Sequence, residues 1–486
     1  MVKSSLPLLP SSIAFGTDGW RGILGVDFTL ERLQIVAIAA AQELSYRACE
    51  GRANSKIIIG YDRRFLAAQM AEAIASAVRS CELEPVLTMT ALPTPACSYA
   101  VVKHQALGAL VVTASHNPPE WLGLKIKGPL GGSVEGDFTK AVEKRIAAGG
   151  INNPIEGKTE RFDARQEHIN FLKHEFDIPE IIKGLKKLGL NLIVDPMHGS
   201  AAGCIGDLFG QDEKGLISEI RSNCDPLFGG NPPEPLPKYI NQLIGTIKGL
   251  SRAGKLSLGL VFDGDGDRIA AIDEKGRYCS TQFLMPLLID HLAGIRKSPG
   301  CVLKTVSGCD LMNLVAESHG REVFELPVGF KYIAKEMQER EVLIGGEESG
   351  GIGFGSHIPE RDALFTALVL LESIAEGGIP LGERLDNIQV RFGEVNFDRV
   401  DLFLDNMDVR KRFETFLSQS PPKTILDIPV RKIIAIDGIK LRLGQSYWIM
   451  FRFSGTEPLL RIYCEAPSKE EVRKTLDWAK KMIEDI

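Results

Sequence analysis

The chain has 486 residues, more than the roughly 250–300 that a single hydrophobic core supports, so its length predicts about three domains. A hydrophobic fraction of 44% and a charged fraction of 25% exclude a disordered or fibrous protein. The 57 basic and 63 acidic residues leave a net charge of −6 without long blocks of one sign, which argues against nucleic acid or a membrane surface as a partner.

The N-terminus and the cysteines indicate a cellular compartment. Pro7 and Pro10 interrupt the apolar run near the N-terminus, and no run in the chain approaches the ~18 apolar residues of a membrane span. The nine cysteines include no CxxC pair and are odd in number, which favours reduced thiols over disulfides or a zinc site. We therefore expect a cytoplasmic protein.

Short apolar runs alternate with longer segments of helical periodicity. Helices are predicted at 30–46 and 65–79, and strands, in chain order, at 56–62, 108–113, 190–195, 256–263, 301–306 and 341–345. Strands separated by helices are typical of an α/β fold with largely parallel pairing, in which ligands bind beyond the carboxyl ends of the strands. Several of these strands end in aspartate, which suggests a repeated unit.

The C-terminal part of the chain has a different pattern. It combines a charged helical segment near Asp408, predicted strands at 434–441 and 447–453, and a closing helix from Lys469. We expect an α+β domain there. Candidate domain boundaries lie in stretches rich in Gly, Pro or charged turn residues, at 149–154, 273–276 and 379–386.

A serine follows the predicted strand at 108–113, in the run TASHNPP at 113–119. The two prolines keep this loop from continuing as a helix. A helix cap or a turn would explain Ser115 and Asn117. A nucleophilic or phosphorylated Ser115 is the alternative, with His116 and Lys125 to move protons or bind phosphate oxygens. The run lacks a G-x-S-x-G elbow, which disfavours a Ser-His-Asp hydrolase.

Three aspartates alternate with glycines in DGDGDR at 263–268, again at the end of an apolar strand. Asp263, Asp265 and Asp267 can point into one compact loop, and Mg²⁺ prefers such carboxylates together with a substrate phosphate. Arg268 would bind phosphate oxygens bidentately. A hairpin turn built on D-G is one alternative, and an EF-hand is another, but Arg268 stands where an EF-hand needs Gly. The run therefore predicts a metal loop.

Three further glycine-containing runs hold polar or charged residues. GGEESGG at 345–351 offers carboxylates and a hydroxyl to sugar hydroxyl groups. RFSGTEP at 452–458 offers an Arg, two hydroxyls and accessible backbone N–H groups, which together form a phosphate cradle. FGTDGWRG at 15–22 is a glycine-rich loop with one Arg. Each run alone also fits an ordinary loop, and the lack of a Walker A sequence argues against a P-loop NTPase.

Together, the five runs resemble the α-D-phosphohexomutases, the family of phosphoglucomutases and phosphomannomutases. They occur in the family's order. FGTDGWRG is similar to its opening loop, TASHNPP to its phosphoserine loop, DGDGDR to its metal loop, GEESG to its sugar-recognition loop and RFSGTEP to its phosphate-binding loop. The resemblance covers the whole chain.

The resemblance implies four domains around a central cleft, namely three similar α/β domains and a smaller C-terminal α+β domain. The expected divisions are 1–155 with the phosphoserine loop, 156–275 with the metal loop, 276–385 with the sugar-recognition loop and 386–486 with the phosphate-binding loop. The expected domain count thus rises from three to four because of the resemblance and not because of the length.

The resemblance also implies a reaction. Ser115 would carry a phosphoryl group, and Asp263, Asp265 and Asp267 would hold Mg²⁺ with the phosphoserine as another ligand. The enzyme would interconvert hexose 1-phosphate and hexose 6-phosphate through a 1,6-bisphosphate that turns around in the cleft, with glucose 1,6-bisphosphate as activator. Residues expected at the reacting oxygen are Arg21, His116 and Lys125. Residues expected to bind substrate are Arg268, Lys304, Gly329, Lys331, Glu347, Ser349, Arg452, Ser454, Gly455 and Thr456.

Two details bear on the substrate. Gly351 stands where some bacterial relatives carry His, so a proton role for that His cannot be carried over to this chain. GFKY at 329–332 and Ala114 look more like hexose mutases than phosphoglucosamine mutases, and we expect glucose ahead of mannose. The expected partner is a small-molecule phosphosugar, and the expected state is a monomer or weak dimer.

Two other functions remain open. A glucose-1,6-bisphosphate synthase would keep every motif and release the bisphosphate as its product. A non-catalytic sugar-phosphate sensor would share the scaffold, but the intact Ser115 and the three aspartates argue against it.

Overall fold

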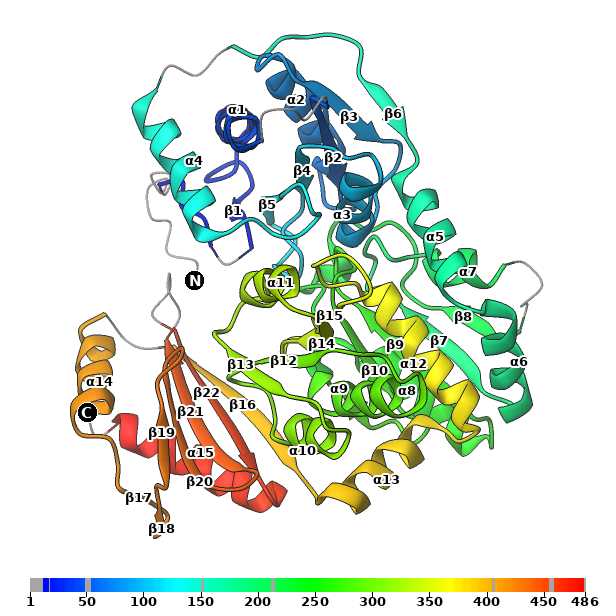
Figure 1. The fold of residues 1–486 in the computed structure, drawn as a ribbon, viewed down its shortest axis with the longest axis vertical. Helices are drawn as coiled ribbons and strands as arrows, with labels where there is room; N and C mark the ends of the chain where they lie inside the picture. The colour runs from blue at the N-terminus through cyan, green and yellow to red at the C-terminus, as the bar shows by residue number, and fades with distance from the viewer. Residues whose placement is uncertain are drawn as a thin grey trace.

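Four β-sheets organise the chain in the computed structural model, which describes residues 12–16, 18–48, 54–149, 153–210, 215–403, 407–453 and 459–484. Figure 1 shows the first sheet and its helices at the top, the second and third sheets next to each other below it, and the fourth sheet beside the third. This arrangement confirms the expected α/β fold of three similar units and a different C-terminal unit.

The first unit is a six-stranded sheet. Its strands, in spatial order, are β1 (Trp20–Ile23), β5 (Trp121–Lys127), β4 (Gly108–Val112), β2 (Lys56–Tyr61), β3 (Glu84–Thr88) and β6 (Glu160–Phe162). Its helices are α1 (Leu30–Arg47), α2 (Ala67–Arg79), α3 (Thr94–Lys103) and α4 (Gly136–Ala148). Ile57 and Ile59 pack with α1 and α2, whereas Ile58 packs with α3 on the other face. Burial on both faces explains the continuous apolar run of β2.

The second unit is a five-stranded sheet. Its strands, in spatial order, are β11 (Tyr278–Cys279), β10 (Ile269–Ile272), β9 (Ser257–Phe262), β7 (Asn191–Asp195) and β8 (Ile217–Glu219). Its helices are α5 (Ala164–Glu175), α6 (Ile178–Leu188), α7 (Cys204–Phe209) and α8 (Asn241–Arg252), and the 3₁₀ turns are η2 (Phe228–Gly230) and η3 (Pro237–Tyr239). The strands β6 and β11 lie a few residues beyond the divisions expected at 155 and 275.

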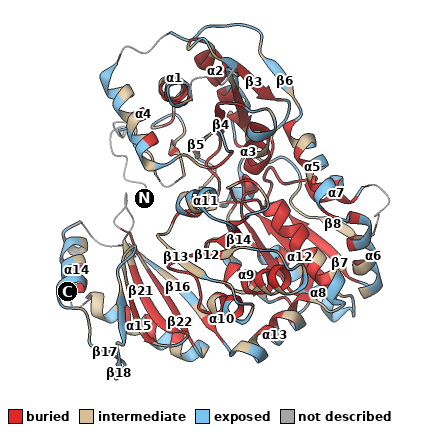
Figure 2. Ribbon diagram, viewed as in Figure 1, coloured by how far each residue is buried: buried red, intermediate tan, exposed pale blue. Residues whose placement is uncertain are grey.

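The third unit has four strands, in the order β13 (Val323–Leu326), β12 (Cys301–Thr305), β14 (Val342–Gly346) and β15 (Ile352–Phe354). Its helices are α9 (Thr281–Ile289), η4 (Asp290–Ile295), α10 (Leu311–Ser318), α11 (Phe330–Glu339), α12 (Ala363–Gly377) and α13 (Leu381–Phe392). One hydrophobic cluster runs from Leu192 of the second unit to Leu368 of the third, so the two units share a core. Figure 2 shows α9 and α12 within this buried region.

The described residues contain no single helix that is long and apolar enough to cross a membrane. The pair α12 and α13, which is bent by 82°, meets the criteria of length and composition when the two are taken together.

The fourth unit is an antiparallel sheet packed against two helices. Its strands, in spatial order, are β16 (Asn396–Phe403), β22 (Leu459–Ala466), β21 (Tyr447–Phe453), β20 (Ile439–Gly444) and β19 (Lys432–Ile434). The helices are α14 (Met407–Gln419) and α15 (Lys469–Glu484), and a small hairpin consists of β17 (Thr424–Ile425) and β18 (Ile428–Pro429). This confirms the expected α+β unit, with one error. The predicted strand at 434–441 is a hairpin, because the D-G pair forms a turn in which Gly438 has φ of 85°.

The first three sheets share one detail of pairing. Their central strands are parallel, as expected, but each sheet also contains a strand that runs antiparallel to a central strand and follows it in sequence. These antiparallel neighbours are β5 after β4, β10 after β9 and β15 after β14. The repeated unit suggested by the sequence is therefore a parallel sheet with one reversed strand.

Candidate active site

Three of the sequence motifs occupy equivalent loops, each between a central strand and its antiparallel neighbour. TASHNPP joins β4 to β5, DGDGDR joins β9 to β10, and GEESG joins β14 to β15. The loops meet in space: the Ser115 hydroxyl donates to Asp263 Oδ2 at 2.8 Å, and the Ile269 N–H donates to the Gly350 carbonyl at 3.0 Å. The repeated topology thus brings three distant motifs to one place.

The serine loop and the aspartate loop are in direct backbone contact. A Cβ at Gly264 would lie 2.5 Å from the Ser115 carbonyl oxygen, so a larger residue would push the loops apart. Thr94 donates twice to the aspartate loop, from its N–H to the Asp265 carbonyl at 2.8 Å and from its hydroxyl to Asp265 Oδ2 at 2.6 Å. These contacts fix the aspartates relative to the serine.

Arg64, at the start of the segment that leads into α2, anchors the serine loop. Its buried guanidinium donates four hydrogen bonds of 2.6–3.1 Å, to the carbonyl oxygens of Ser115, Asn117, Pro118 and Trp121. A guanidinium presents several N–H donors in a rigid plane, which suits this gathering of carbonyl groups. Arg64 therefore sets the path of the backbone around the serine.

Asp62 completes this anchor. Its Oδ2 accepts the Thr113 hydroxyl at 2.6 Å, and Thr113 Oγ1 accepts the Ser115 N–H at 2.9 Å. Burial raises the pKa of Asp62 to about 6, even though Arg64 lies 3.3 Å away. Ser115 itself has φ of 51°, a left-handed conformation that costs free energy outside glycine. The anchors hold the serine in that conformation.

Two other predicted residues flank Ser115. His116 Nδ1 lies 3.4 Å from Ser115 Oγ. Burial, reinforced by Arg268 and Arg21, lowers the pKa of His116 well below its usual range. Arg21 Nη1 donates to Asn117 Oδ1 at 2.6 Å, so its guanidinium also lies at the serine loop.

The three aspartates of DGDGDR form a compact acidic site. One oxygen from each of Asp263, Asp265 and Asp267 lies within 4.8 Å of the other two, and all three side chains are fully buried. Burial and the other two carboxylates raise the pKa of Asp263 well above its usual range. Among the described residues, Asp265 Oδ1 and Asp267 Oδ1 have no hydrogen-bond partner. Buried oxygens of this kind fit a hard divalent cation such as Mg²⁺.

Two buried cations face the aspartates from the other side. Lys125 Nζ lies 2.7 Å from Asp267, 2.8 Å from Asp265 and 2.9 Å from Asp18 of the opening loop. Burial lowers the pKa of Lys125, but these carboxylates outweigh burial and raise it well above its usual range. Arg361 Nη2 lies 2.5 Å from Asp18 and 2.8 Å from Asp267. The site thus combines an acidic side and a cationic side.

The GEESG loop borders the same region. Glu347 is buried, and burial raises the pKa of its carboxyl, which lies 3.4 Å from Arg361 Nη1. Ser349 is half-buried in the same turn. Arg268 forms an isolated backbone bridge with Gly351, which joins the aspartate loop to this one.

Lys304 of β12 lies beside the start of the GEESG loop, because its backbone is in register with Gly346 of β14. Its buried ammonium donates to the carbonyls of Gly308 and Cys309 at 3.2 and 3.0 Å, and it lies 3.2 Å from Glu325. Lys304 therefore lies in a buried charge cluster next to the fourth unit, where Lys440 donates to the Val306 carbonyl at 2.8 Å. By contrast, Gly329 caps α11, and Lys331 lines a small cavity together with residues 15, 16, 18 and 19 of the opening loop.

The fourth unit contributes two arginines at the end of a hairpin. Arg452 of β21 is paired directly with Arg461 of β22, and Arg452 Nε donates to Asp437 at 2.9 Å. Like charges directly opposite each other on a sheet destabilise it, and a bound anion would offset their repulsion. The pair therefore supports a phosphate site. The other predicted residues of that loop, Ser454, Gly455 and Thr456, lie outside the described residues.

Sequence reasoning missed several residues of the site. Arg361 and Arg64 stand in IPERDALF and YDRRFLA, where charged residues precede an apolar helical segment and suggest only a solvated helix start. Asp18 lies within the FGTDGWRG run and Arg461 lies three residues after the RFSGTEP run, but neither residue type in those positions indicates a role by itself. The buried positions of these charges depend on contacts between units, which no local pattern reveals.

Comparison with known proteins identifies the same four units. The chain matches the models of the phosphoglucomutase/phosphomannomutase family: α/β/α domain I at residues 12–151, domain II at 166–276, domain III at 281–392 and the C-terminal domain at 394–479.

Individual relatives match over nearly the full length. A phosphoglucomutase/phosphomannomutase from Thermococcus kodakarensis is 28% identical over 476 residues, which cover 97% of this chain and 98% of the relative. A phosphoglucosamine/phosphogalactosamine mutase from Sulfurisphaera tokodaii is 28% identical over 479 residues, with coverage of 97% and 99%. A candidate phosphomannomutase from Thermus thermophilus, known from its crystal structure, is 31% identical in sequence. The two structures align with a TM-score of 0.83 over 98% of this chain and 100% of that one. The chain belongs to the phosphoglucomutase/phosphomannomutase family of phosphomutases.

Proposed function

We propose that this phosphomutase interconverts hexose 1-phosphate and hexose 6-phosphate through a phosphorylated Ser115, with glucose as the preferred hexose. The observation that carries the proposal is the 2.8 Å hydrogen bond between the Ser115 hydroxyl and Asp263, which seats the serine against the buried aspartate triad. An ordinary capping turn would not bury a serine hydroxyl against the carboxylate of Asp263. The geometry therefore favours the phosphoserine hypothesis over the cap.

The roles of the surrounding residues follow from their charge and position. A phosphoryl group in transfer is loose and anionic, so positioning and positive charge supply most of the catalysis. Lys125, Arg21 and Arg268 would supply that charge, and Arg361 joins them. Lys125 stays protonated because its carboxylate neighbours raise its pKa, so it acts as a fixed cation. His116, next to Ser115 Oγ, is the group placed to handle a proton.

The aspartate triad fits Mg²⁺. Asp263, Asp265 and Asp267 would hold the ion together with an oxygen of the modified Ser115, and the partnerless oxygens of Asp265 and Asp267 are available for it. When bound, Mg²⁺ supplies neutralisation of the charge on the transferring phosphoryl group. Thr94 and Lys125 both contact Oδ2 of Asp265 and so orient this carboxylate, as neighbours of metal ligands commonly do.

The reaction needs a site that accepts a sugar in two orientations. Phosphoserine 115 would give its phosphoryl group to the free hydroxyl of the hexose monophosphate, forming a 1,6-bisphosphate and a free serine hydroxyl. After the intermediate turns, Ser115 would recover the other phosphoryl group. Free glucose 1,6-bisphosphate would act as activator because it can phosphorylate Ser115 again. The Arg452 loop, with Ser454, Gly455 and Thr456, would bind the resting phosphate, and Glu347 and Ser349 would bind sugar hydroxyls.

The names of the relatives refer to glucose, mannose and glucosamine phosphates. GFKY at 329–332 supports glucose, because by family resemblance phosphoglucosamine mutases tend to carry an acidic residue and Arg in this segment. We propose further that the enzyme is a cytoplasmic monomer or weak dimer whose partner is a small phosphosugar.

Product analysis tests the function. Purified enzyme is incubated with Mg²⁺, trace glucose 1,6-bisphosphate and, in separate reactions, glucose, mannose or glucosamine 1-phosphate. We expect the 6-phosphate from all hexoses that are turned over, with the highest kcat/KM for glucose. The absence of any 6-phosphate would refute the mutase. A parallel reaction with glucose 1-phosphate and fructose 1,6-bisphosphate distinguishes the synthase, which would accumulate glucose 1,6-bisphosphate.

A further inference from the structure

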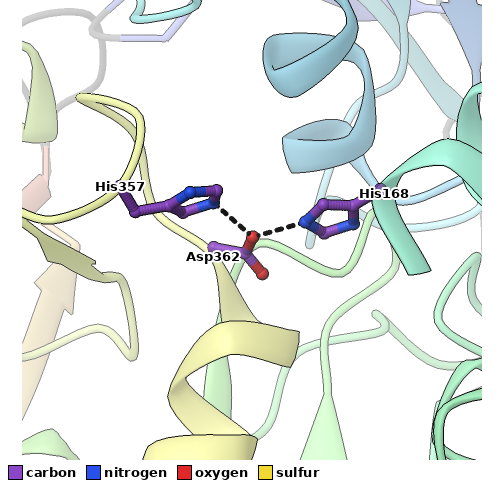
Figure 3. Close-up of side chains that lie close together, drawn as sticks. All are labelled: His168, His357 and Asp362. Carbon is purple, nitrogen blue, oxygen red and sulfur yellow. Dashed lines mark hydrogen bonds and ion pairs between the residues drawn. The ribbon is translucent and has the colours of Figure 1, made fainter. Parts of the chain in front are cut away.

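Two histidines and an aspartate form a buried cluster outside the loops described above (Figure 3). His168 of α5 and His357 of the β15–α12 loop both place Nε2 next to Asp362 Oδ2, at 2.8 and 2.9 Å. The three side chains are at most 1% exposed. His168 and Asp362 are 194 positions apart in the chain, so the cluster joins α5 to the third unit.

The acceptor positions of Asp362 are filled. Its Oδ1 accepts the N–H groups of Leu364 and Phe365 at 3.0 Å each, which makes it the N-cap of α12, and its Oδ2 accepts the two imidazoles. Because a carboxylate only accepts hydrogen bonds, each Nε2 must carry the hydrogen. Burial raises the pKa of Asp362, but the two histidines outweigh it and hold the pKa well below its usual range.

A metal ion is the alternative occupant of such a cluster, since the three ligand atoms lie within 4.8 Å of one another. A metal would require both Nε2 lone pairs to point at one position. Figure 3 shows instead that the imidazoles approach the same oxygen from opposite sides. The geometry therefore favours a hydrogen-bonded clamp, in which stacking of His357 on Phe365, with ring centroids 4.8 Å apart, fixes the ring.

The residue before Asp362 reaches into the candidate active site. Arg361 contacts one carboxylate from each of the first three units: Asp18 at 2.5 Å, Asp267 at 2.8 Å and Glu347 at 3.4 Å. Its guanidinium is therefore the point at which the opening loop, the aspartate loop and the sugar-recognition loop are joined. Its backbone is fixed on one side by the clamped, helix-capping Asp362.

We infer that His168 and His357 are positioning residues of the mutase site, which clamp Asp362 and thereby hold Arg361 between the three loops. The inference rests on the proposed function, because it assigns the clamp a role in that reaction. Within the part of the chain that the structure describes, His168 forms no hydrogen bond or ion pair with another residue of the site, so its effect on turnover must pass through Asp362 and Arg361. A clamp with only a structural role would affect stability and leave the turnover of folded enzyme unchanged.

Substitution of His168 separates these two roles. His168→Leu removes one donor to a buried carboxylate, and we expect kcat for glucose 1-phosphate to fall roughly tenfold or more, the factor that one hydrogen bond to a charged group represents, with KM changed less than about threefold. His168→Gln keeps an N–H at the position of Nε2 and should recover most of kcat. His174→Leu, on the exposed end of the same helix, is the matched control and should behave as wild type.

A double-mutant cycle with Arg361→Lys tests the route of the effect. Lysine cannot bind three carboxylates as the guanidinium does, so the Arg361→Lys variant lacks most of the contacts that the clamp positions. We expect His168→Leu to cost less than about threefold in the Arg361→Lys background, because residues that act through one another are not additive. Thermal unfolding of all variants confirms that the folded protein is being compared.

The outcomes distinguish the inference from the function on which it rests. Wild-type enzyme without hexose phosphate mutase activity would refute the proposed function. If the wild-type enzyme is active, two results would refute the clamp. In one, His168→Leu leaves kcat unchanged; in the other, His168→Leu lowers kcat by the same factor in the wild-type and the Arg361→Lys backgrounds. Elemental analysis that finds a stoichiometric transition metal, lost in folded His168→Leu, would also refute it in favour of a metal site.

Discussion

Arg64 offers the sharpest test of how the fold prepares the serine. Its guanidinium donates to four carbonyl oxygens of the serine loop, and its Nε lies 3.3 Å from the Asp62 carboxylate. Arg64→Met keeps much of the side-chain volume but removes every one of these bonds. Ser115 would then have to keep a left-handed backbone, with φ of 51°, without its main support.

The magnitude follows from the burial of these groups. Removal of one partner from a buried, hydrogen-bonded charge costs about 3–5 kcal/mol, because the remaining groups lose their partners. That is a large share of the roughly 5–15 kcal/mol that stabilises a typical domain, so the first unit should unfold at a lower temperature yet still fold. Catalysis is more sensitive, since a misplacement of about 1 Å can cost about 10²-fold. We expect kcat to fall by about that factor.

The assay compares three variants by steady-state turnover of glucose 1-phosphate and by thermal unfolding. Arg64→Lys keeps the charge but not the planar set of donors, so its kcat should lie between those of Arg64→Met and wild type. Arg63→Met is the matched control, because Arg63 donates to the Ser222 carbonyl at 2.8 Å and not to the serine loop. If Arg64→Met retains kcat within about threefold of wild type, or if Arg63→Met loses as much, the anchoring argument is wrong.

Three further outcomes test other parts of the site. The pKa of Asp62 in the folded protein, about 6, lies above the ordinary aspartate value of 3.8, so this group stabilises the fold below about pH 4 and that contribution is lost as the pH rises through 6. The stability of Asp62→Asn relative to wild type should therefore increase by up to about 3 kcal/mol between pH 4 and 7.5 in urea denaturation, and a constant difference would contradict the assigned shift. Asp265→Asn should raise the Mg²⁺ concentration for half-maximal activity at least about tenfold; activity that survives both this change and a chelator would make the loop structural. Arg452→Lys should weaken glucose and mannose phosphates equally, and Glu347→Gln should change their ratio; equal losses for both sugars in Glu347→Gln would refute the division of roles.

The sequence was most informative where one strand leads directly into a chemical motif. The apolar runs before Ser115 and Asp263 predict strands, and the carboxyl ends of strands are where α/β folds bind ligands. The structure confirms both strands and brings the two residues to hydrogen-bond distance. The reversed strand after each motif was not predicted, because pairing direction depends on long-range contacts.

The sequence was least informative for charges buried between units. Arg64, Arg361 and His168 belong to helix starts or a helix face that look solvated, and only tertiary packing buries them. For Lys304 the resemblance implies a substrate contact, which stays a prediction; in the structure its ammonium donates to the Gly308 and Cys309 carbonyls, next to the fourth unit. Local patterns report periodicity and turns, but they do not report which charged groups meet across units.

Mass spectrometry of the Ser115 peptide tests the central claim most directly. Purified enzyme is treated with glucose 1,6-bisphosphate, freed of sugar, digested and compared with the same enzyme after an excess of glucose 6-phosphate and with Ser115→Ala. The account predicts one phosphoryl group on Ser115 after the bisphosphate, its loss to the acceptor sugar, and no mutase turnover in Ser115→Ala. A fully active enzyme whose phosphoryl group is on another residue, or one that turns over with Ser115 replaced, would contradict it.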